Sequence, residues 1–342
     1  MESLELIKKI APEILEIIEK RYAILRAVLY HQPVGRRVLS MKLNLKERTI
    51  RDEVEILKKQ GLLKIESKGM YITQGGKDML EGLFSIHGNL RGISQLENEL
   101  KKILNIKKII IIPGNCEENR MVLKDMGKIT LEILKKSIDS KDIIGITGGS
   151  TMAAVAAEAI FDNKERDILV IPARGGLGKY LNTQSNSIAA KLAEGLGGSY
   201  RLLYIPDNLE ADTLEYILKN KEISQSIGLI NNIDTLVFGL GKASTMAQRR
   251  DLSLEKIKKL KDSGAVAEAF GHFFDIEGRE VWEYKTIGLS LEQFKSLDSL
   301  IGVAGGEDKA QAIVSISKLN KNLTLITDQS AAKKIFEMNT RL

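Results

Sequence analysis

The sequence is short of several residue types, and each shortage excludes a class of structure. Its 342 residues contain one cysteine, Cys116, so no disulfide can form within the chain, and a reducing compartment fits. The three histidines, His31, His87 and His272, are far apart, and no His, Cys or Asp cluster has metal-ligand spacing. No apolar run approaches the roughly 20 residues that a membrane-spanning helix needs. We therefore expect a cytoplasmic protein without a metal, long enough to form two domains.

Positive charge is concentrated in one part of the chain. The net charge is +6, and the stretch from His31 to Met70 holds ten Lys or Arg against five Asp or Glu. The rest of the chain is therefore almost neutral. A compact basic module attached to a neutral body is typical of a protein that binds nucleic acid.

The basic module has the element order of a winged helix-turn-helix. A short first helix is expected to end near Asn44, which tolerates the left-handed conformation of a tight turn. A second helix is expected from Lys46 to Gly61, with Ile50, Val54 and Leu57 on its buried side. Two alternating strands, LLKIES and MYIT, follow and are predicted to be joined by a turn at Lys68-Gly69. In a winged helix the second helix enters the major groove and the hairpin lies along the phosphate backbone.

Positions within this module predict the DNA contacts. The exposed side of the second helix is expected to present three side chains to base edges: Arg48, Thr49 and Arg51. Five other cations are expected to contact phosphates, which set register and affinity: Arg36, Arg37, Lys42, Lys46 and Lys68. The alternative is that these charges form an ordinary solvated helix face.

A helical stretch from Gln74 to Ile106 follows the basic module. Its apolar spacing would suit pairing between subunits, but three glycines interrupt it, each at a cost of about 1 kcal/mol relative to alanine. A linker helix packed on its own domain and a dimer seam are both open. We expect a homo-oligomer, because DNA-binding modules of this size work as symmetric pairs. The predicted domains are residues 1–88 with an N-terminal helix, a linker helix of residues 89–106, and residues 107–342.

After Lys107 the chain alternates short apolar runs with helical segments. The runs are KKIIII, DIIGIT, DILVIP, YRLLYIP, DTLVFG, SLIGVAG and LTLIT. This alternation predicts a doubly wound, mostly parallel α/β domain. Ligands of such sheets bind at the carboxyl ends of the strands, where the loops emerge.

Four of those loops have the composition of anion-binding sites. The first places Gly148, Gly149, Ser150 and Thr151 at a helix start, where backbone amides and hydroxyls can hold a phosphate. The other three carry cations: Arg174 beside Gly175, then Lys242 with Arg249 and Arg250, and finally Lys309. Gln184, further along the second loop, could reach a sugar hydroxyl. Because the loops offer two anion grips, a bisphosphate suits them better than a monophosphate.

Several motifs in this half of the chain resemble the effector domain of SorC-type bacterial transcription regulators. They are TGGSTM, PARGGLG, TMAQRR, AVAEAFGHFFD and VAGGEDKAQAI, and the likeness extends from RYAILRAVL through PVGRRVLS to TDQSAAKKI. The resemblance implies a DNA-binding repressor, tetrameric on DNA. It also implies an effector domain like those of sugar-phosphate isomerases and glucosamine-phosphate deaminases. For the glycolytic branch of the family it implies fructose 1,6-bisphosphate as effector, with other glycolytic phosphates as possible occupants.

The same resemblance implies roles for individual residues. One phosphate would be held by Gly149, Ser150, Thr151 and Lys309. The other would be held by Arg174, Gly175 and Arg249, with Gln184 and Glu268 near the sugar hydroxyls. The family often has TGGTT where this chain has TGGST, and the substitution keeps the hydroxyl.

An enzyme is the alternative, because the implied fold is shared with isomerases. Isomerisation needs a general base beside the substrate carbon. The deaminases carry Asp-Gly-His after a glycine turn, whereas this chain reads GLGKASTMAQRR there, with neither carboxylate nor histidine. Glu268 is the one candidate base, and we expect it to accept hydrogen bonds from sugar hydroxyls instead. The sequence therefore favours a sensor without catalytic residues: a repressor of glycolytic genes that holds its operator when sugar bisphosphate is scarce.

Overall fold

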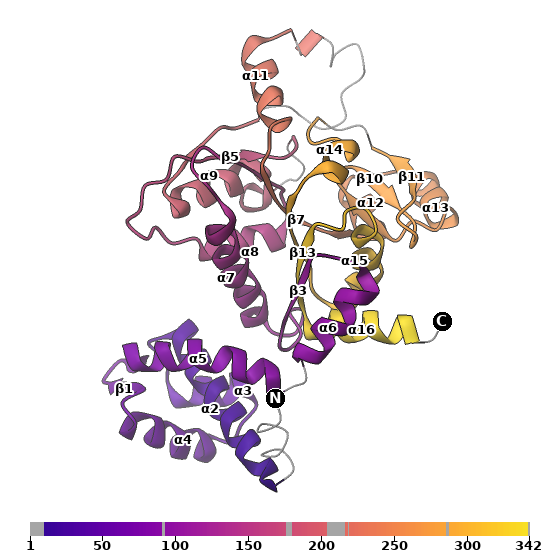
Figure 1. The fold of residues 1–342 in the computed structure, drawn as a ribbon. Coiled ribbons are helices and arrows are strands. Elements are labelled where there is room, and N and C mark those ends of the chain that lie inside the picture. Colours follow the sequence, from indigo (N-terminus) through magenta and orange to yellow (C-terminus); the bar gives the residue numbers. More distant parts are fainter. Residues whose placement is uncertain are drawn as a thin grey trace. The chain divides into compact units, whose positions relative to one another are not determined.

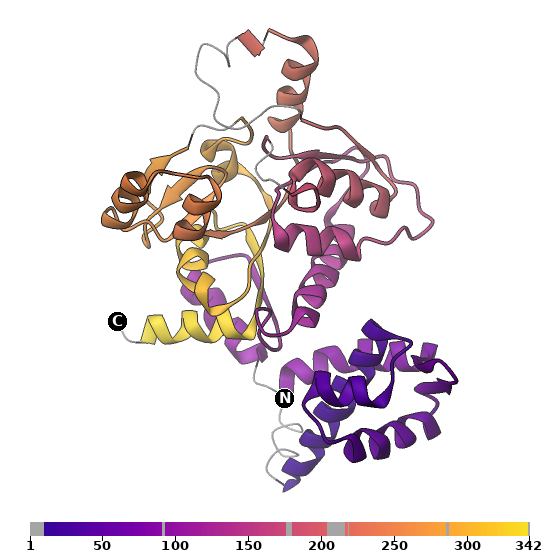
Figure 2. The ribbon, with the colours of Figure 1, turned by 180° about the vertical axis from the view of Figure 1, so that it is seen from behind.

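The computed structural model describes residues 10–90, 93–175, 180–203, 216–217, 219–284 and 287–340. The chain divides into two compact units, Met1–Ser94 and Gln95–Leu342 (Figure 1; Figure 2 gives the view from behind). The finer division into residues 1–88, 89–106 and 107–342 stays a prediction. Within the described residues, no helix is both long enough and apolar enough to cross a bilayer.

The first unit is a winged helix-turn-helix, as predicted. Its elements are α2 (Pro12–His31), α3 (Arg36–Leu43), α4 (Glu47–Lys59), β1 (Leu63–Glu66), β2 (Gly69–Ile72) and α5 (Gln74–Leu90). Asn44 ends α3 in the left-handed conformation, with φ of 51°. The three apolar residues expected on the inner side of α4, Ile50, Val54 and Leu57, are all buried. The sharp turn and the apolar stripe together set α4 across α3.

The hairpin turn lies one residue earlier than predicted. Glu66 pairs with Gly69 across the hairpin, so the turn consists of Ser67 and Lys68. Gly69 is already the first residue of β2, with φ of +141°. A Cβ at this position would lie 2.9 Å from the backbone nitrogen of Val34. Glycine at this position therefore permits close contact between β2 and the segment before α3. The sequence pattern predicts a turn from the same glycine.

The second unit is built on the predicted parallel sheet. Its strands are β3 (Lys108–Ile112), β4 (Ile143–Ile146), β5 (Leu169–Pro172), β6 (Ser199–Tyr200), β7 (Thr235–Gly239), β12 (Ser299–Val303) and β13 (Leu323–Asp328). Their order is β3-β13-β12-β7-β4-β5-β6, with every pair parallel. From β4 the chain continues through β5 and β6 toward one edge of the sheet, and from β7 it continues through β12 and β13 toward the other edge. The strand order therefore reverses between β4 and β7.

Helices cover both faces of this sheet. One face carries α7 (Arg120–Ser137), α8 (Ser150–Glu158) and α9 (Ser185–Leu196), and the other carries α15 (Ala310–Ser317) (Figure 1). Helix α11 (Lys221–Ile230) precedes β7, and α16 (Gln329–Thr340) follows β13. Helix α6 (Ile93–Leu104) buries Leu100 and Leu104, and its Glu97 accepts a 2.8 Å hydrogen bond from the Ile111 amide of β3. Helix α6 therefore packs on its own domain, and a dimer seam along the helical stretch stays a prediction.

A second sheet, which the sequence pattern does not predict, stands beside the first. Its order is β11-β10-β9-β8, formed by β8 (Gly241–Lys242), β9 (Ala267–Ala269), β10 (His272–Phe274) and β11 (Glu280–Glu283). All three pairs are antiparallel. It packs with α12 (Ala243–Arg249) and α13 (Leu254–Asp262) through a small core of Ala243, Ala247, Leu260 and Phe273. Strands of two to four residues are too short to give a readable alternation.

Candidate functional site

A cavity of about 530 Å³ opens in the second unit at the carboxyl ends of the parallel strands. The loops that leave β4 and β7 both line it, and these strands flank the point where the strand order reverses. Such a crevice is where open α/β sheets bind ligands. The candidates that line it are Gly148, Gly149, Ser150, Thr151, Arg174, Gly175, Arg249, Glu268 and Lys309. Gln184, at the start of α9, does not line the cavity, although its neighbours Thr183 and Ser185 do.

The loop after β4 forms one wall of the cavity. Gly149 precedes α8 with φ of +112°, a conformation that suits glycine, and its amide donates to the Thr183 carbonyl at 2.9 Å. The Thr147 hydroxyl accepts a 3.1 Å hydrogen bond from the Gly239 amide and so joins the ends of β4 and β7. The first amides of α8, beginning at Ser150, have no acceptor within the helix. They and the positive end of the helix dipole favour an anion at this wall.

Lys309 brings a cation to the same cavity from the loop after β12. Its side chain is half-buried, and no hydrogen-bond partner of its ammonium is found among the described residues. Burial lowers the pKa of Lys309, and the positive charge of Arg249 lowers it further. The negative charges of Glu117 and Asp328 act in the opposite direction and raise the pKa of Lys309. Two cations that repel each other across a cavity would both be stabilised by an anion placed between them.

Arg174 and Glu268 face each other on another wall. Arg174 follows β5 and is 7% exposed, and its Nη1 lies 3.6 Å from Glu268 Oε1. Glu268 is in β9 of the second sheet, where the same oxygen accepts hydrogen bonds from the Gly271 amide at 2.8 Å and from Arg250 Nη2. The carboxylate that the sequence left as a possible base is therefore held by two guanidinium groups. The sequence pattern identifies Arg250 only as one of the cations of its loop and does not predict this contact.

A buried aspartate fixes the loop that carries Lys309. Asp328 is fully buried at the end of β13 and accepts hydrogen bonds from four groups: the amides of Cys116, Gly306 and Ala331 and the hydroxyl of Ser330. It thus connects the loop after β3 with the loop after β12. Burial, assisted by the charge of Asp328, raises the pKa of the Cys116 thiol to about 12. A lone aspartate at a strand end gives no pattern from which this role could be predicted.

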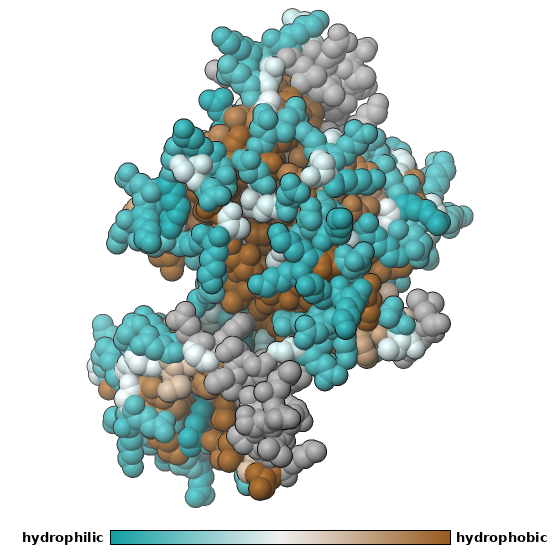
Figure 3. Space-filling view, viewed as in Figure 1, coloured by the Kyte–Doolittle hydropathy of each residue, from teal (hydrophilic) through white to brown (hydrophobic). Residues whose placement is uncertain are grey.

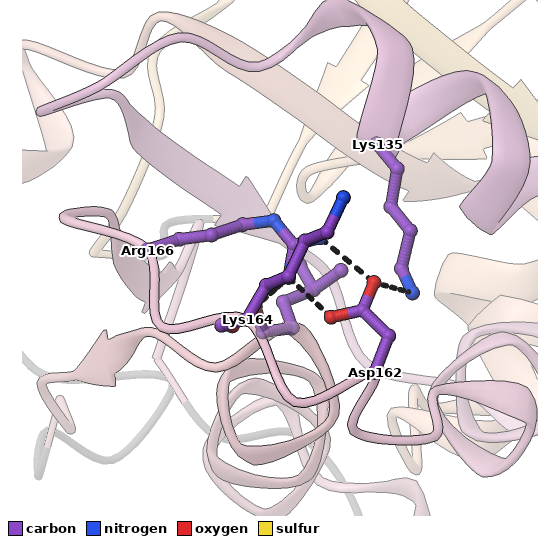
Figure 4. Close-up of polar contacts among 5 residues, drawn as sticks. Lys135, Asp162, Lys164 and Arg166 are labelled. Atoms are coloured by element: carbon purple, nitrogen blue, oxygen red, sulfur yellow. Dashed lines mark hydrogen bonds and ion pairs between the residues drawn. The ribbon is translucent and has the colours of Figure 1, made fainter.

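Two further ion-pair groups lie on the surface of this unit. At the rim of the cavity, Lys242 Nζ lies 3.0 Å from Asp308 Oδ2. Outside the cavity, Asp162 accepts hydrogen bonds from both terminal nitrogens of Arg166 and, at 2.9 Å, from Lys135 Nζ (Figure 4). The pKa of Asp162 is held well below its usual range by these bonds, first by those from Arg166. This cluster ties the segment after α8 to α7.

The predicted DNA-contacting cations lie on the first unit and are accessible. Arg48, Thr49 and Arg51 occupy the first two turns of α4, with both arginines exposed and Thr49 half-buried. In the space-filling view, hydrophilic side chains project at the lower left, where Figure 1 places α4 (Figure 3). Lys42, Lys46 and Lys68 are exposed, Arg36 is half-buried, and exposed Arg37 lies 3.8 Å from Glu47. Across the described residues, no group of three His, Cys, Asp or Glu side chains could hold a metal ion.

Comparisons with known proteins match both units. The family model described as "Putative sugar-binding domain" matches residues 89–337, and that described as "CggR N-terminal DNA binding domain" matches residues 17–86. The central glycolytic genes regulator of Bacillus subtilis (strain 168) is 39% identical over 328 residues, which are 96% of each chain. That of Priestia megaterium is 37% identical over 97% of each chain.

Solved structures of related regulators share the fold of this chain. A SorC family transcriptional regulator from Enterococcus faecalis superposes with a TM-score of 0.67 at 36% identity, covering 71% of this chain and 99% of that one. The full-length sorbitol operon regulator SorC from Klebsiella pneumoniae covers 92% of this chain and 97% of its own, with a TM-score of 0.65 at 20% identity. The second match extends the shared fold to both units.

Proposed function

The chain belongs to the SorC-type family of sugar-binding transcriptional regulators, on the branch of the central glycolytic genes regulators, and on this premise we propose that it represses glycolytic genes under the control of a sugar bisphosphate. The effector we propose is fructose 1,6-bisphosphate, with other glycolytic sugar phosphates as weaker occupants. One observation carries the proposal: a single cavity at the strand-order reversal gathers the cations of three separate loops, Arg174, Arg249 and Lys309.

Two grips in this cavity suit a doubly phosphorylated sugar. The start of α8, with Gly148, Gly149, Ser150 and Thr151, and Lys309 would hold one phosphate. Arg174 and Arg249, with the Gly175 backbone, would hold the other, because a guanidinium can donate two parallel hydrogen bonds to one phosphate. Glu268 would accept hydrogen bonds from the sugar hydroxyls. Gln184, which does not line the cavity, would reach these hydroxyls only after a change in the conformation of its loop. Burial and the positive charge of Arg249 lower the pKa of Lys309, and anions bound at the two grips would offset the repulsion between these cations.

A sugar-phosphate isomerase or deaminase is the alternative function, and we propose that the protein is not an enzyme. No histidine is among the described lining residues, and Glu268 Oε1 is occupied by Arg250, Gly271 and Arg174. A base so engaged has no open position for a substrate proton at that oxygen. Incubation with glucosamine 6-phosphate and fructose 6-phosphate should give no product, and any turnover would revive the enzyme alternative.

The first unit would read the operator. We propose that Arg48, Thr49 and Arg51 contact base edges in the major groove, while Arg36, Arg37, Lys42, Lys46 and Lys68 contact phosphates. The protein would act in the cytoplasm as a homo-oligomer, a tetramer on DNA, with a DNA-binding domain of residues 1–88 and a linker of 89–106. The effector changes DNA binding only if it binds two arrangements of this oligomer with different affinity.

The direct test is DNA binding by the full-length protein with and without fructose 1,6-bisphosphate. Double-stranded DNA selected by the protein from a random pool serves as the probe in fluorescence anisotropy. We expect the sugar bisphosphate to lower the affinity or the cooperativity of binding at fixed salt. Unchanged affinity together with unchanged cooperativity would contradict the regulatory part of the proposal.

A further inference from the structure

Arg250 is a buried cation beside the cavity that does not line it. It lies one residue beyond the end of α12, directly after Arg249, and its side chain has no exposed surface. Its guanidinium carbon is 4.7 Å from the centre of the Tyr284 ring, and its Nη2 donates to Glu268. The Tyr284 amide in turn donates to the Gly271 carbonyl at 2.8 Å. Tyr284 directly follows β11 and Glu268 is in β9, so ring and carboxylate belong to the same antiparallel sheet. The guanidinium thus contacts two side chains from the same sheet, one on its face and one at Nη2.

Glu268 is shared unequally between two arginines. Arg250 forms a direct hydrogen bond to Oε1, whereas Arg174 Nη1 lies 3.6 Å from the same atom, an ion-pair distance that is too long for a good hydrogen bond. The carboxylate side chain is only 4% exposed, so water cannot replace a lost partner. Arg250 is therefore the principal partner of Glu268, and the contact of Glu268 with Arg174 is the weaker of the two.

This inequality matters because Arg174 and Glu268 both line the cavity, whereas Arg250 does not. A phosphate can draw Arg174 toward itself only if Glu268 keeps another positive partner when Arg174 turns away. We propose that Arg250 is a positioning residue: it neutralises Glu268 and so makes Arg174 available to the second phosphate of a sugar bisphosphate. The inference rests on the proposed function, since it concerns how the same cavity binds that ligand.

The proposal makes a charge-specific prediction. In Arg250→Met, Glu268 keeps its charge, and Arg174 becomes its remaining cationic partner. The buried carboxylate then competes with the incoming phosphate for Arg174, and the affinity for bisphosphate should fall about tenfold or more. Removing the competing charge as well, in Arg250→Met/Glu268→Gln, should restore most of that affinity. Glutamine retains the oxygen that accepts from the Gly271 amide.

The experiment is isothermal titration calorimetry of the full-length protein with fructose 1,6-bisphosphate. It compares the wild type, Arg250→Met, Glu268→Gln and the double variant, each checked by its thermal unfolding midpoint. Arg249→Met, alone and with Glu268→Gln, is the matched control. It removes the neighbouring cation that does line the cavity, so its loss of affinity should not be restored by Glu268→Gln.

The outcomes separate this inference from the function on which it rests. No binding by the wild type would overturn the proposed effector. Normal binding by the wild type with unchanged binding by Arg250→Met, or with no restoration in the double variant, would overturn the positioning role alone. If Arg250→Met fails to fold, the double variant and Glu268→Gln still decide, because the proposal requires them to bind the sugar bisphosphate within about threefold of each other. A double variant that binds tenfold more weakly would overturn it.

Discussion

Gly148 lies so close to Thr183 that a Cβ on residue 148 would stand 2.8 Å from the Thr183 carbonyl oxygen. The same oxygen accepts the hydrogen bond of the Gly149 amide, so the loop after β4 and the short 3-10 turn η1 (Leu181–Thr183) are fitted to each other. This contact leaves no room for a side chain between them. It sets the position of the α8 start, where we propose that one phosphate binds.

The first prediction follows from that contact. Gly148→Ala should push η1 away from the loop, reduce fructose 1,6-bisphosphate affinity about tenfold and destabilise the fold by about 1–3 kcal/mol. Gly228→Ala, in helix α11 with nothing within 4 Å of its Cβ position, is the matched control and should raise stability by up to about 1 kcal/mol. Calorimetric titration and urea unfolding measure the two effects. Equal affinities of Gly148→Ala and the wild type would show that the close contact does not shape the site.

A second prediction concerns the wing of the first unit. Lys68 is exposed in the hairpin turn with no partner among the described residues, whereas Lys64 Nζ lies 2.8 Å from Glu66 Oε1. If the wing lies along the DNA backbone, Lys68→Gln should lower affinity for all sequences and reduce the slope of log affinity against log salt by about 1. Lys64→Gln removes a charge that is already neutralised and should change that slope less. A larger effect of Lys64→Gln, measured by anisotropy across a salt series, would place the contact elsewhere on the wing.

A third prediction uses the depressed pKa of Asp162. Its folded-state pKa lies below the unfolded value of about 3.9, because Arg166 and Lys135 donate hydrogen bonds to the charged form. The stability that Asp162 contributes is therefore complete above the unfolded pKa and is lost as pH falls toward the folded pKa. Asp162→Asn should be less stable than the wild type at pH 6, and the difference should shrink as the pH is lowered to 3.

Urea unfolding at a series of pH values measures this difference. Glu165→Gln is the control, because Glu165 is an exposed carboxylate three residues along the same segment. It should give a stability difference that varies little with pH. A constant penalty for Asp162→Asn over the whole range would mean that shape, and not charge, holds this segment to α7.

The fourth prediction is that Cys116 is unreactive. A thiol with a pKa of about 12 is a thiolate in only about 1 molecule in 10,000 at pH 8, and Cys116 is also half-buried. Iodoacetamide should alkylate the folded protein at least about 100-fold more slowly than the urea-unfolded chain. Asp328→Asn removes the charge that helps to raise the pKa, so it should speed alkylation of the folded protein. Equal rates for folded and unfolded wild type, followed by mass spectrometry, would contradict both the burial and the charge argument.

Much of this architecture could be predicted from the sequence because the signals are local. The apolar runs of the parallel sheet, such as DIIGIT and DTLVFG, are long enough to identify as strands, and Asn44 marks its turn by its own conformational preference. Loops at the ends of parallel strands necessarily meet at one edge of the sheet. Arg174, Arg249 and Lys309 therefore share a cavity although 135 residues separate the first from the last.

The features of the site that could not be predicted from the sequence depend on tertiary contacts. The second sheet has strands of two to four residues, which carry no readable alternation, so the sequence alone does not place Glu268 between two arginines. Asp328 holds two loops through backbone amides, which have no sequence signature. Gly69 is predicted as a turn residue but is the first residue of β2, and its positive φ goes with a close approach to Val34 that no local pattern indicates.

The last prediction concerns the pH dependence of effector binding. Lys309 must be protonated to hold a phosphate, and its pKa in the protein is lowered by burial and by Arg249. Affinity for fructose 1,6-bisphosphate should therefore fall as the pH rises through a value below the ordinary 10.5 of lysine. Arg249→Gln removes one positive neighbour, so the pKa of Lys309 should rise and the fall in affinity should move to higher pH, even though the affinity at pH 7 is lower.

Titrations between pH 7.5 and 10.5 test this sign, since over that range the phosphates of the ligand stay fully ionised and do not contribute to the profile. Lys242→Gln is the control, because Lys242 is paired with Asp308 at the rim and should leave the position of the fall unchanged. If Arg249→Gln moved the fall to lower pH, the two cations could not be neighbours across one cavity. The positive charge of Arg249 would then not be the one that lowers the pKa of Lys309, and the placement of the two phosphate grips side by side in one cavity would be wrong.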